Sequence, residues 1–503
     1  MLKLIDRFLN GITMYKLVFY ELVFLLLAAA GLGALGILSF DPIYLAFSAL
    51  FIFSISWIGN GVFSYFFDAP YNPESTWITA LILALIITPP AAFVDGTYLP
   101  LAVWASLWAV ASKYLLAIRK KHIFNPAALG VAVPALTLGL SASWWVGTPA
   151  MVPFVLVGGL LIVRKIHRFD LWWAFIGAFF IGILYFTIDH HLDIVRSLEQ
   201  SFLTAPTFFF ATVMLTEPQT APSTRLWRML FGAGVAVLFL PNVSIGSFYF
   251  TPELALLAGN IGAYLVSPKG KIILTLKEKI RRSADVFELV FAPERQLAFS
   301  AGQYMEWTLP HEGADSRGVR RYFTLSSSPE EGDVRLGVKF YAPASTFKRK
   351  LFSMQPGDSI VAAQLAGDFT LPRDRAKKLV FIAGGIGITP FASMLRHLIA
   401  THEQRDIVVL YANKTPADAV YHELLEEAER ELGIKTVHVF SAPPSGAPAK
   451  IDAALVASAV PDYAERTFYI SGPQGMVASF KGMLRGLGVS RLRIKTDYFP
   501  GFA

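Results

Sequence analysis

The sequence predicts a polytopic α-helical membrane domain, followed by an antiparallel β-barrel domain and an α/β doubly wound domain. Three observations predict this order. The chain of 503 residues is 54% hydrophobic and only 16% charged, whereas an ordinary soluble domain carries about 25% charged residues. Long apolar runs follow one another between Tyr15 and Val266, and ordinary charge density returns after Lys269. Short alternating strands and then strand–helix repeats occupy this second half.

About ten apolar segments of the first half are candidates for spanning helices, because a helix needs about 20 mostly apolar residues to cross a bilayer. Their ranges are 17–38, 43–66, 77–94, 98–118, 126–140, 149–163, 171–188, 205–215, 226–240 and 252–266. Several are short, and the segment at 205–215 is bounded by Pro206 and Pro218. Such interrupted segments are typical of broken or re-entrant helices that line a protected site.

The basic residues predict the orientation of these helices. If the N-terminus is cytoplasmic, ten crossings place thirteen basic residues on the inner side and only Arg196 on the outer side, which is a strong positive-inside bias. The inner residues are Lys3, Arg7, Lys16, Arg119, Lys120, Lys121, Arg164, Lys165, Arg168, Arg225, Arg228, Lys269 and Lys271. We therefore expect a multi-pass protein in the lipid bilayer of the cell inner membrane, with both termini in the cytoplasm.

The composition also excludes several classes of site. The chain has no cysteine, which excludes disulfides, cysteine-ligated zinc and all-cysteine iron–sulfur clusters, and we predict no metal site. A net charge of +7 could suit nucleic acid. The basic residues lie beside apolar segments instead of forming one stripe, however, so we expect no nucleic-acid partner.

Two polar segments interrupt the apolar half. Residues 119–128 contain Phe124-Asn125-Pro126-Ala127, and residues 216–222 contain Glu217-Pro218. Asparagine followed by proline suits the start of a helix, with asparagine as its cap. The first segment also resembles the "FNPA" motif of the D subunit of the Rnf complex and the B subunit of the sodium-translocating NADH:quinone reductase. Ala211-Thr212 with Glu217-Pro218 loosely resembles the second turn of that family, and the resemblance covers residues 15–266.

This resemblance implies a flavin in the membrane domain. The family carries FMN covalently on the threonine of an "SGAT" string at the outer face. That string is absent here, and the nearest match is Gly147-Thr148-Pro149 in a predicted outer loop. Thr148 is therefore the candidate attachment residue, and a noncovalent flavin, a quinone site or no cofactor in this domain remain open.

The remaining chain divides into two domains after a membrane domain at 1–268. Residues 269–372 contain short strands without intervening helices, which predicts a small barrel. These strands are 284–291, 303–309, 321–329 and 334–340. In residues 373–503 strands alternate with helices, which predicts a doubly wound parallel sheet. These strands are 379–383, 407–411, 436–440 and 467–471.

Two turns of this last domain combine glycine with the end of a strand. One is 384–390, Gly-Gly-Ile-Gly-Ile-Thr-Pro, and the other begins Ser471-Gly472-Pro473. Glycine lets the backbone approach a pyrophosphate, and the N–H groups of the following helix face it. Either turn alone could be a tight connection. Because ligands of such sheets bind at the carboxyl ends of strands, the pair predicts nucleotide binding.

Together, the second and third domains resemble the ferredoxin–NADP+ reductase family. Its flavin motif, Arg-x-Tyr-Ser/Thr, matches Arg321-Tyr322-Phe323-Thr324, with phenylalanine in place of tyrosine. The resemblance implies FAD as the cofactor, with Arg321 at its phosphate, Phe323 stacked on the isoalloxazine and the Thr324 hydroxyl near N5. Ser345-Thr346 occupies the place of the second phosphate motif, without its usual glycine.

The same resemblance assigns the nicotinamide nucleotide and the reacting centre. Residues that match the family's two nucleotide turns are Gly384, Gly385, Gly387, Thr389, Pro390, Gly472 and Pro473. Ser471 stands in the place of a cysteine that lies near the hydride path in the family. Phe499, in the acidic–aromatic segment 497–502, is the candidate cover of the flavin ring. Thr324, Ser471 and Phe499 are thus the candidate catalytic residues.

We interpret the chain as a membrane-bound NAD(P)H-dependent flavin oxidoreductase. Electrons from cytoplasmic NADH would pass through FAD into the membrane domain, to a quinone or an outward-facing acceptor. NADH is favoured over NADPH because no arginine follows Ser441, where the family's NADPH readers carry a Ser-Arg pair. The alternatives are a transporter or channel with a nucleotide- or flavin-sensing domain, and a redox-coupled ion pump using Lys113 and Glu217.

Overall fold

The structure is a computed structural model, and it describes residues 2–499 except 69–72, 120, 242, 247, 268–269, 316, 341–342 and 444–448. Two compact units, Met1–Gly270 and Lys271–Ala503, make up the chain. Lys120 and Lys269 of the predicted inner charge and residues 500–502 of the predicted terminal segment lie outside the described residues.

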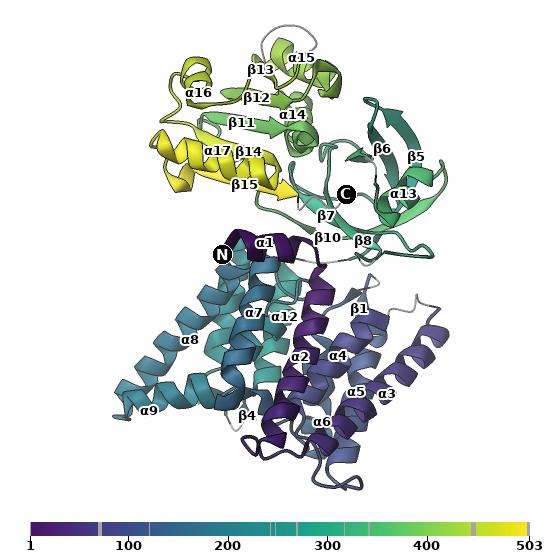
Figure 1. Cartoon of the computed structure of the whole chain (residues 1–503), viewed down its shortest axis with the longest axis vertical. Helices are drawn as coiled ribbons and strands as arrows, with labels where there is room; N and C mark the ends of the chain where they lie inside the picture. The colour runs from purple at the N-terminus through teal and green to yellow at the C-terminus, as the bar shows by residue number, and fades with distance from the viewer. Residues whose placement is uncertain are drawn as a thin grey trace. The chain divides into compact units, whose positions relative to one another are not determined.

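The first unit is helical, and each of the ten predicted segments contains a helix (Figure 1). Its α-helices are α1 (Leu2–Asn10), α2 (Met14–Ala34), α3 (Pro42–Phe66), α4 (Pro73–Ile86), α5 (Tyr98–Leu115), α6 (Pro126–Leu138), α7 (Val152–Lys165), α8 (Phe169–Asp189), α9 (Ile194–Glu199), α10 (Thr207–Phe209), α11 (Arg225–Leu238) and α12 (Pro252–Val266). The two helices α1 and α9 were not predicted. The segment predicted at 77–94 ends early, at Ile86, because Pro89 and Pro90 follow and a residue before proline is disfavoured in a helix.

The short segment predicted at 205–215 is indeed an interrupted helix. Its single α-helical turn, α10, continues into a π-helical turn, η4 (Phe210–Met214), and π-helical turns occur frequently at functional sites. A second π-helical turn, η3 (Gln200–Thr204), precedes it. The chain then leaves the helix at Glu217-Pro218, the second polar segment of the sequence.

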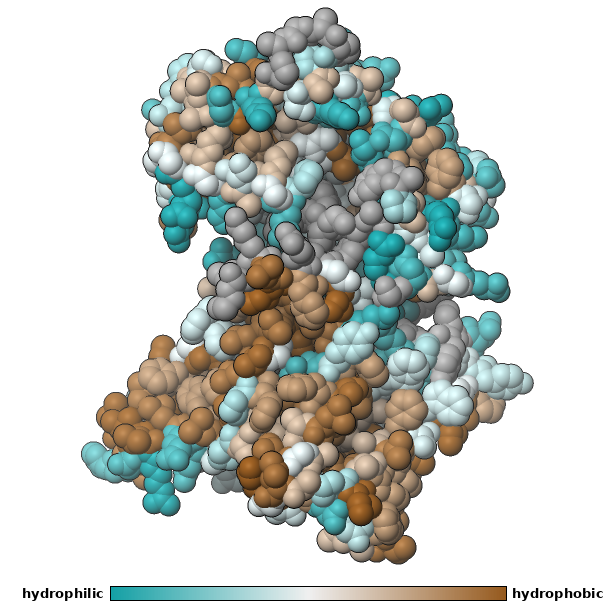
Figure 2. Space-filling view, in the orientation of Figure 1, coloured by the Kyte–Doolittle hydropathy of each residue, from teal (hydrophilic) through white to brown (hydrophobic). Residues whose placement is uncertain are grey.

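Three helices of this unit, α2, α3 and α8, are long and apolar enough to cross a membrane, by length and composition. Their outward side chains are apolar as well, since Leu27, Leu50, Trp57 and Ile181 are all more than half exposed. Figure 2 shows such hydrophobic residues gathered over the visible face of the helical unit. Exposed apolar surface of this extent marks a site of contact with a membrane or with another protein. The number of crossings and their orientation remain predictions.

The second unit begins with a six-stranded antiparallel sheet in the order β8-β7-β10-β5-β6-β9. Its strands are β5 (Ile272–Arg281), β6 (Val286–Pro293), β7 (Tyr304–Thr308), β8 (Arg320–Thr324), β9 (Val334–Lys339) and β10 (Ser359–Ala366). The edge strands β8 and β9 are linked where Ser326 N donates to the Arg335 carbonyl. A helix that the strand pattern missed, α13 (Thr346–Ser353), packs its buried Phe347 and Leu351 into the core of this sheet.

A five-stranded parallel sheet follows, in the order β13-β12-β11-β14-β15, as the alternation of strands and helices predicts. Its strands are β11 (Leu379–Gly384), β12 (Ile407–Asn413), β13 (Lys435–Phe440), β14 (Thr467–Pro473) and β15 (Ile494–Phe499). The helices are α14 (Thr389–Thr401), α15 (His422–Leu432), α16 (Ala453–Ala459) and α17 (Gln474–Gly486). Phe381 packs with α14 on one face, and Val380 packs in a second cluster on the other. Both faces of the sheet are therefore buried.

Candidate functional site

The first predicted site element is Arg321, on edge strand β8. Its side chain is 8% exposed, and Nη1 donates to the carbonyls of Arg317, Gly318 and Arg320 at 2.8, 3.1 and 2.7 Å. The guanidinium lies over the Phe347 ring, 5.2 Å from its centroid. Burial lowers the pKa of Arg321 to about 10. A cation held this far from water gains strongly from an anionic ligand.

The second predicted phosphate motif lies beside this arginine. Ser345 caps α13 by accepting from Lys348 N at 3.2 Å, and Thr346 exchanges two hydrogen bonds with Asp315, both of 3.0 Å. Burial opposes ionisation of Asp315, but hydrogen bonds from Arg317 and Thr346 hold its pKa well below the usual range. The start of α13 thus joins a cluster with three basic residues, Arg317, Arg321 and Lys348, which suits a phosphate.

The other three residues of the flavin motif differ in their surroundings. Phe323 contacts Phe347, with ring centroids 6.0 Å apart, so it shares a face of β8 with Arg321. Tyr322 is 40% exposed, and its hydroxyl donates to Glu306 at 2.9 Å. Thr324 is buried, and its Oγ1 has no hydrogen-bond partner among the described residues. A buried hydroxyl without a partner is costly in a protein, and a ligand atom would supply the missing partner.

The two nucleotide turns lie next to each other, as predicted. Strands β11 and β14 are parallel neighbours in which Ala383 pairs with Ser471. Strand β11 ends at Gly384 and β14 at Pro473, so both strands finish within one residue of each other at the carboxyl edge of the sheet. Gly385 adopts φ of +54°, a left-handed conformation that favours glycine. Thr389 and Pro390 then begin α14 directly after the 3₁₀ turn η5 (Gly385–Ile388), so the positive end of the helix lies at this edge.

Gly387 fixes how closely the two turns approach. A Cβ at this position would lie 2.5 Å from the Ser471 carbonyl oxygen and 2.7 Å from Gly472 N. Both atoms belong to the backbone and cannot turn aside, so only glycine fits. Gly472, with φ of +153°, is the second backbone position of the contact. The pair of turns forms one continuous backbone surface.

Ser471 lies at the centre of this surface. It is fully buried, and its Oγ has no hydrogen-bond partner among the described residues. Phe499 pairs through its backbone with Pro473 in β15, which places the end of the chain's last strand beside the Ser471–Pro473 turn. The Phe499 side chain, the predicted cover of the flavin ring, lies outside the described residues.

A second polar site lies within the helical unit, where the two polar segments of the sequence meet. Asn125 caps α6 by accepting from Ala128 N, and its Nδ2 donates to Glu217 Oε2 at 2.9 Å. Thr220 donates to the same oxygen at 3.1 Å, and His122 Nε2 lies 3.6 Å from Glu217 Oε1. The helix-start interpretation of Asn125 is therefore confirmed, and the same side chain also holds the half-buried Glu217 carboxylate.

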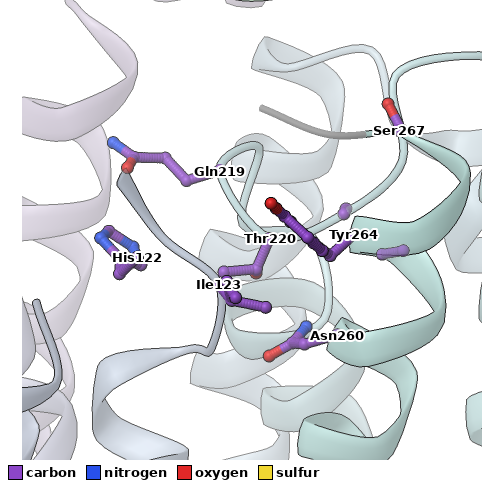
Figure 3. Close-up of a pocket in the computed structure, with 9 residues that line it drawn as sticks. His122, Ile123, Gln219, Thr220, Asn260, Tyr264 and Ser267 are labelled. Atoms are coloured by element: carbon purple, nitrogen blue, oxygen red, sulfur yellow. The ribbon is translucent and has the colours of Figure 1, made fainter. Parts of the chain in front are cut away.

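A small pocket opens beside this cluster (Figure 3). Its lining is mostly polar and comprises His122, Ile123, Gln219, Thr220, Ala221, Asn260, Ala263, Tyr264 and Ser267. Asn260 Oδ1 accepts from Asn125 N at 2.8 Å, which ties α12 to the start of α6. Lys113, the other predicted embedded charge, donates to Ser75 and Thr79 instead.

Sequence reasoning missed two further buried carboxylates of this unit. Glu21 in α2 is 8% exposed, and a Cβ at Gly158 of α7 would collide with it. Glu253 in α12 is 1% exposed and accepts from Trp144 Nε1 at 2.9 Å. The charged residues embedded in this unit therefore include more than Lys113 and Glu217. Charged residues placed singly among apolar ones are the signal that could have found both.

Comparison with known proteins places families on the second unit. Residues 271–370 match the oxidoreductase FAD-binding domain and residues 381–481 match the oxidoreductase NAD-binding domain. The flavohemoprotein of Pseudomonas putida is 28% identical over 232 residues, covering 44% of this chain and 58% of that protein. The flavohemoprotein of Bacillus subtilis is 32% identical over 174 residues, covering 33% and 42%. The chain thus spans about half the length of these curated relatives.

Among solved structures, the cytochrome P450 reductase GcoB of Amycolatopsis aligns with 24% identity and a TM-score of 0.42, over 46% of this chain and 72% of that one. The family matches show that residues 271–481 form a ferredoxin reductase-like module that binds FAD and NAD(P)H. These residues therefore carry the two domains of a flavin-dependent NAD(P)H oxidoreductase. Neither family match extends into the helical unit.

The close approach at Gly387 predicts the effect of adding one methyl group. Gly387→Ala should force the two turns apart, destabilise the protein by about 1–3 kcal/mol and weaken NADH binding at least tenfold. Thermal unfolding and NADH titration of the flavin-loaded protein would measure both effects. Gly482→Ala is the matched control, because nothing lies within 4 Å of its Cβ position on α17. Equal effects of the two substitutions would contradict the assignment.

The lowered pKa of Lys348 predicts that FAD affinity and the stability of the FAD-free protein change in opposite directions as the pH rises. Burial, together with Arg321 and Arg317, lowers the pKa of Lys348 from 10.5 to about 8. FAD affinity should therefore fall by up to about tenfold per pH unit above pH 8, as the ammonium loses its proton. The FAD-free protein should become more stable between pH 8 and 10.5, since only the unfolded chain holds the proton there.

Both pH dependences should disappear in Lys348→Met, measured by flavin fluorescence titration and by urea unfolding. An FAD affinity that falls equally in this variant would assign the pH effect to another group. Lys350→Met is the matched control, because Lys350 is an exposed lysine of the same helix.

Proposed function

We propose that the protein is a membrane-bound NAD(P)H-dependent flavin oxidoreductase that passes electrons into its helical unit, to a quinone or an outward-facing acceptor. The observation that carries the proposal is the presence, in one chain, of an FAD- and NAD(P)H-binding module and a helical unit with three helices able to cross a membrane. We place it in the cell inner membrane with both termini in the cytoplasm, because the basic residues favour that orientation.

The second unit supplies the residues for cofactor and substrate. Arg321, Lys348 and the start of α13 would hold the flavin phosphates, and Phe323 offers a partly buried ring beside them. Thr324 would donate its hydroxyl to the flavin, which explains why that hydroxyl has no partner within the described residues. When bound, FAD accepts two electrons at once and releases them singly, which is why it suits transfer from NAD(P)H to a one-electron acceptor.

The glycine turns and α14 would hold the nicotinamide nucleotide. The helix start attracts the pyrophosphate, and Ser471 with Gly472 would border the nicotinamide. Hydride transfer needs orientation of two rings more than an acid or a base. We propose NADH rather than NADPH as the donor, because Ser441 and Ala442 follow β13 where an NADPH reader would carry arginine; Ser445 lies outside the described residues.

In the helical unit we propose that the Asn125–Glu217 cluster borders the acceptor site. Buried polar side chains within apolar helices are costly and mark functional sites by default. The resemblance of Phe124-Asn125-Pro126-Ala127 to the Rnf and NADH:quinone reductase subunits supports an electron-transfer role for this unit. A redox-coupled ion pump is the second candidate, favoured by the same half-buried carboxylate and its neighbour His122.

An FMN attached to Thr148 would add a carrier in this unit. Thr148 lies between two 3₁₀ turns, and its Oγ1 is buried without a hydrogen-bond partner among the described residues. Attachment would therefore require this loop to open during modification. Flavin that stays with acid-precipitated protein, and that is lost in Thr148→Ala, would support the attachment. Retention in that variant would reject it.

The oxidoreductase proposal predicts that NADH bleaches the flavin. An anaerobic absorbance spectrum of the purified protein should lose its flavin band on addition of NADH. Thr324→Val should retain FAD but slow bleaching by about 10- to 100-fold, because one hydrogen bond to the flavin is lost. Thr324→Ser keeps the hydroxyl and should remain close to the wild type. A bound flavin that NADH leaves oxidised would instead favour the nucleotide-sensing transporter or channel.

The acceptor proposal predicts that a substitution of Glu217 affects quinone reduction but not ferricyanide reduction. In Glu217→Gln, NADH should still reduce ferricyanide through the second unit, whereas reduction of a water-soluble quinone should fall at least tenfold, because the cluster loses its charge. Glu253→Gln is the matched control, since Glu253 is a buried carboxylate of the same unit that lies outside this cluster. Equal loss of both activities in Glu217→Gln would point to misfolding, and equal retention would remove the cluster from the electron path.

A further inference from the structure

One face of α14 is directed toward the antiparallel sheet. Ser393, Arg396 and His397 are spaced three and four residues apart and therefore share a side of the helix. Ser393 Oγ donates to the Ser327 carbonyl at 2.6 Å and accepts from Gly302 N at 3.2 Å. His397 Nδ1 lies 2.8 Å from Glu330 Oε1. Each of these contacts joins the NAD-binding domain to the FAD-binding domain.

Arg396 makes a further contact of this kind, to a fully buried carboxylate. Glu288 on β6 is 0% exposed, and its Oε1 accepts from Arg396 Nη2 at 3.2 Å and from Ser326 Oγ at 3.2 Å. Its other oxygen accepts from Arg282 Nη2 at 2.6 Å. Arginines on both sides hold the pKa of Glu288 low in spite of burial, so the carboxylate is charged.

A second carboxylate repeats the arrangement. Glu331 lies 3.4 Å from Arg396 Nη1 and 2.5 Å from Arg335 Nε, and it also accepts from Ser328 N at 2.9 Å. Arg335 Nη1 in turn lies 3.6 Å from Glu288. Arg396 and Arg335 thus contact the same two carboxylates. They differ in that Arg335 belongs to the FAD-binding domain and Arg396 to the NAD-binding domain.

Three serines that take part in these hydrogen bonds follow closely after β8, the strand that carries the predicted flavin motif. Ser326, Ser327 and Ser328 lie two to four positions after Thr324. At its other end, α14 starts at Thr389, immediately after the Gly384–Ile388 turn. Because α14 is a regular helix, the bonds of Arg396 fix how far the turn at the start of α14 lies from the residues that follow Thr324. The contacts therefore link the predicted flavin residue to the predicted nucleotide turn through a few rigid steps.

Close packing between the FAD-binding and NAD-binding domains leaves little room for one to slide against the other. Gly337 of β9 lies so close to α14 that a Cβ there would come 2.7 Å from Thr389 Cγ2 and 2.6 Å from the Tyr421 hydroxyl. The guanidinium groups of Arg282 and Arg396 lie 5.7 and 5.8 Å from the Tyr421 ring centroid. Cations at this distance from an aromatic ring are attracted to it. The two domains thus meet through charges, hydrogen bonds and direct packing.

We propose that Arg396, held by Glu288 and Glu331, is a positioning residue for the hydride step. The proposal rests on the proposed function and deepens it. In that step a hydride, one proton with two electrons, leaves the nicotinamide ring, which is oxidised, and joins the flavin, which is reduced. A misplacement of about 1 Å in such a step can cost about 100-fold in rate. Arg396 touches neither ring; it sets the distance between the elements that hold them.

The matched pair Arg396→Gln and Arg335→Gln tests the proposal in the full-length, FAD-loaded protein. Each substitution removes a guanidinium from the same two carboxylates, but only the first breaks a bond between the domains. In Arg396→Gln we expect flavin reduction by NADH to slow at least tenfold in stopped flow. The deuterium isotope effect with NADH labelled at the transferred position should rise, and the dissociation constant of NADH should change less than about threefold. Arg335→Gln should stay within about twofold of the wild type.

Hydrogen–deuterium exchange gives a readout that does not depend on activity. The Gly302 amide is protected by its bond to Ser393 of α14. Arg396→Gln should increase exchange of peptides that contain Gly302 and Ser326–Ser328, and Arg335→Gln should leave the Gly302 peptide unchanged. Equal slowing in the two variants, or unchanged exchange at Gly302 in Arg396→Gln, would overturn the proposal. If NADH fails to reduce the wild-type flavin, the proposed function fails, while the exchange experiment still tests the link between the domains.

Discussion

The parallel register of β11 and β14 is the constraint on which the rest of the second unit depends. Because Ala383 pairs with Ser471, the two strands end within one residue of each other. The residues at these ends must therefore share the space at the carboxyl edge. Gly387 can occupy that space only because it has no side chain. The start of α14 is fixed by the same contact, and with it the helix face that carries Ser393 and Arg396. Nucleotide binding and domain contact therefore follow from one pair of strands.

Local motifs allowed much of this unit to be predicted from sequence. A glycine-rich segment or an alternating strand depends on a few adjacent residues. The strands near 286–293 and 379–384 and the glycine-containing segments at 384–390 and from Ser471 were therefore predicted. The contact between Arg396 and Glu288 joins residues 108 positions apart, and nothing around either residue marks it. Strand β5 (Ile272–Arg281) was also missed, because its outward residues are mostly charged. Its place between β6 and the distant β10 depends on the sheet as a whole.

Contacts between residues far apart in the sequence also limited the prediction of the helical unit. Both polar segments stand out in an apolar sequence, and their meeting at Glu217 spans 92 positions. Glu21 and Glu253 were overlooked because each is a single carboxylate near the start of an apolar helix, where an acidic residue usually faces water. Packing decides otherwise, as Gly158 and Trp144 lie against them. The number of buried charges in such a unit depends on which helices adjoin, and composition alone does not give it.

The lack of cysteine limits the kinds of electron carrier that either unit can bind. A chain with no cysteine cannot ligate an all-cysteine iron–sulfur cluster, and the electron path that we propose uses flavin and quinone instead. Organic carriers of this kind bind through hydrogen bonds and stacking, and both polar sites of the protein offer such contacts. Thr324 and Ser471 present buried hydroxyls without partners among the described residues. In the helical unit, Asn260 presents a buried amide at the wall of the pocket. The absence of metal-ligating thiols and the presence of these uncommitted donors point to the same class of carrier.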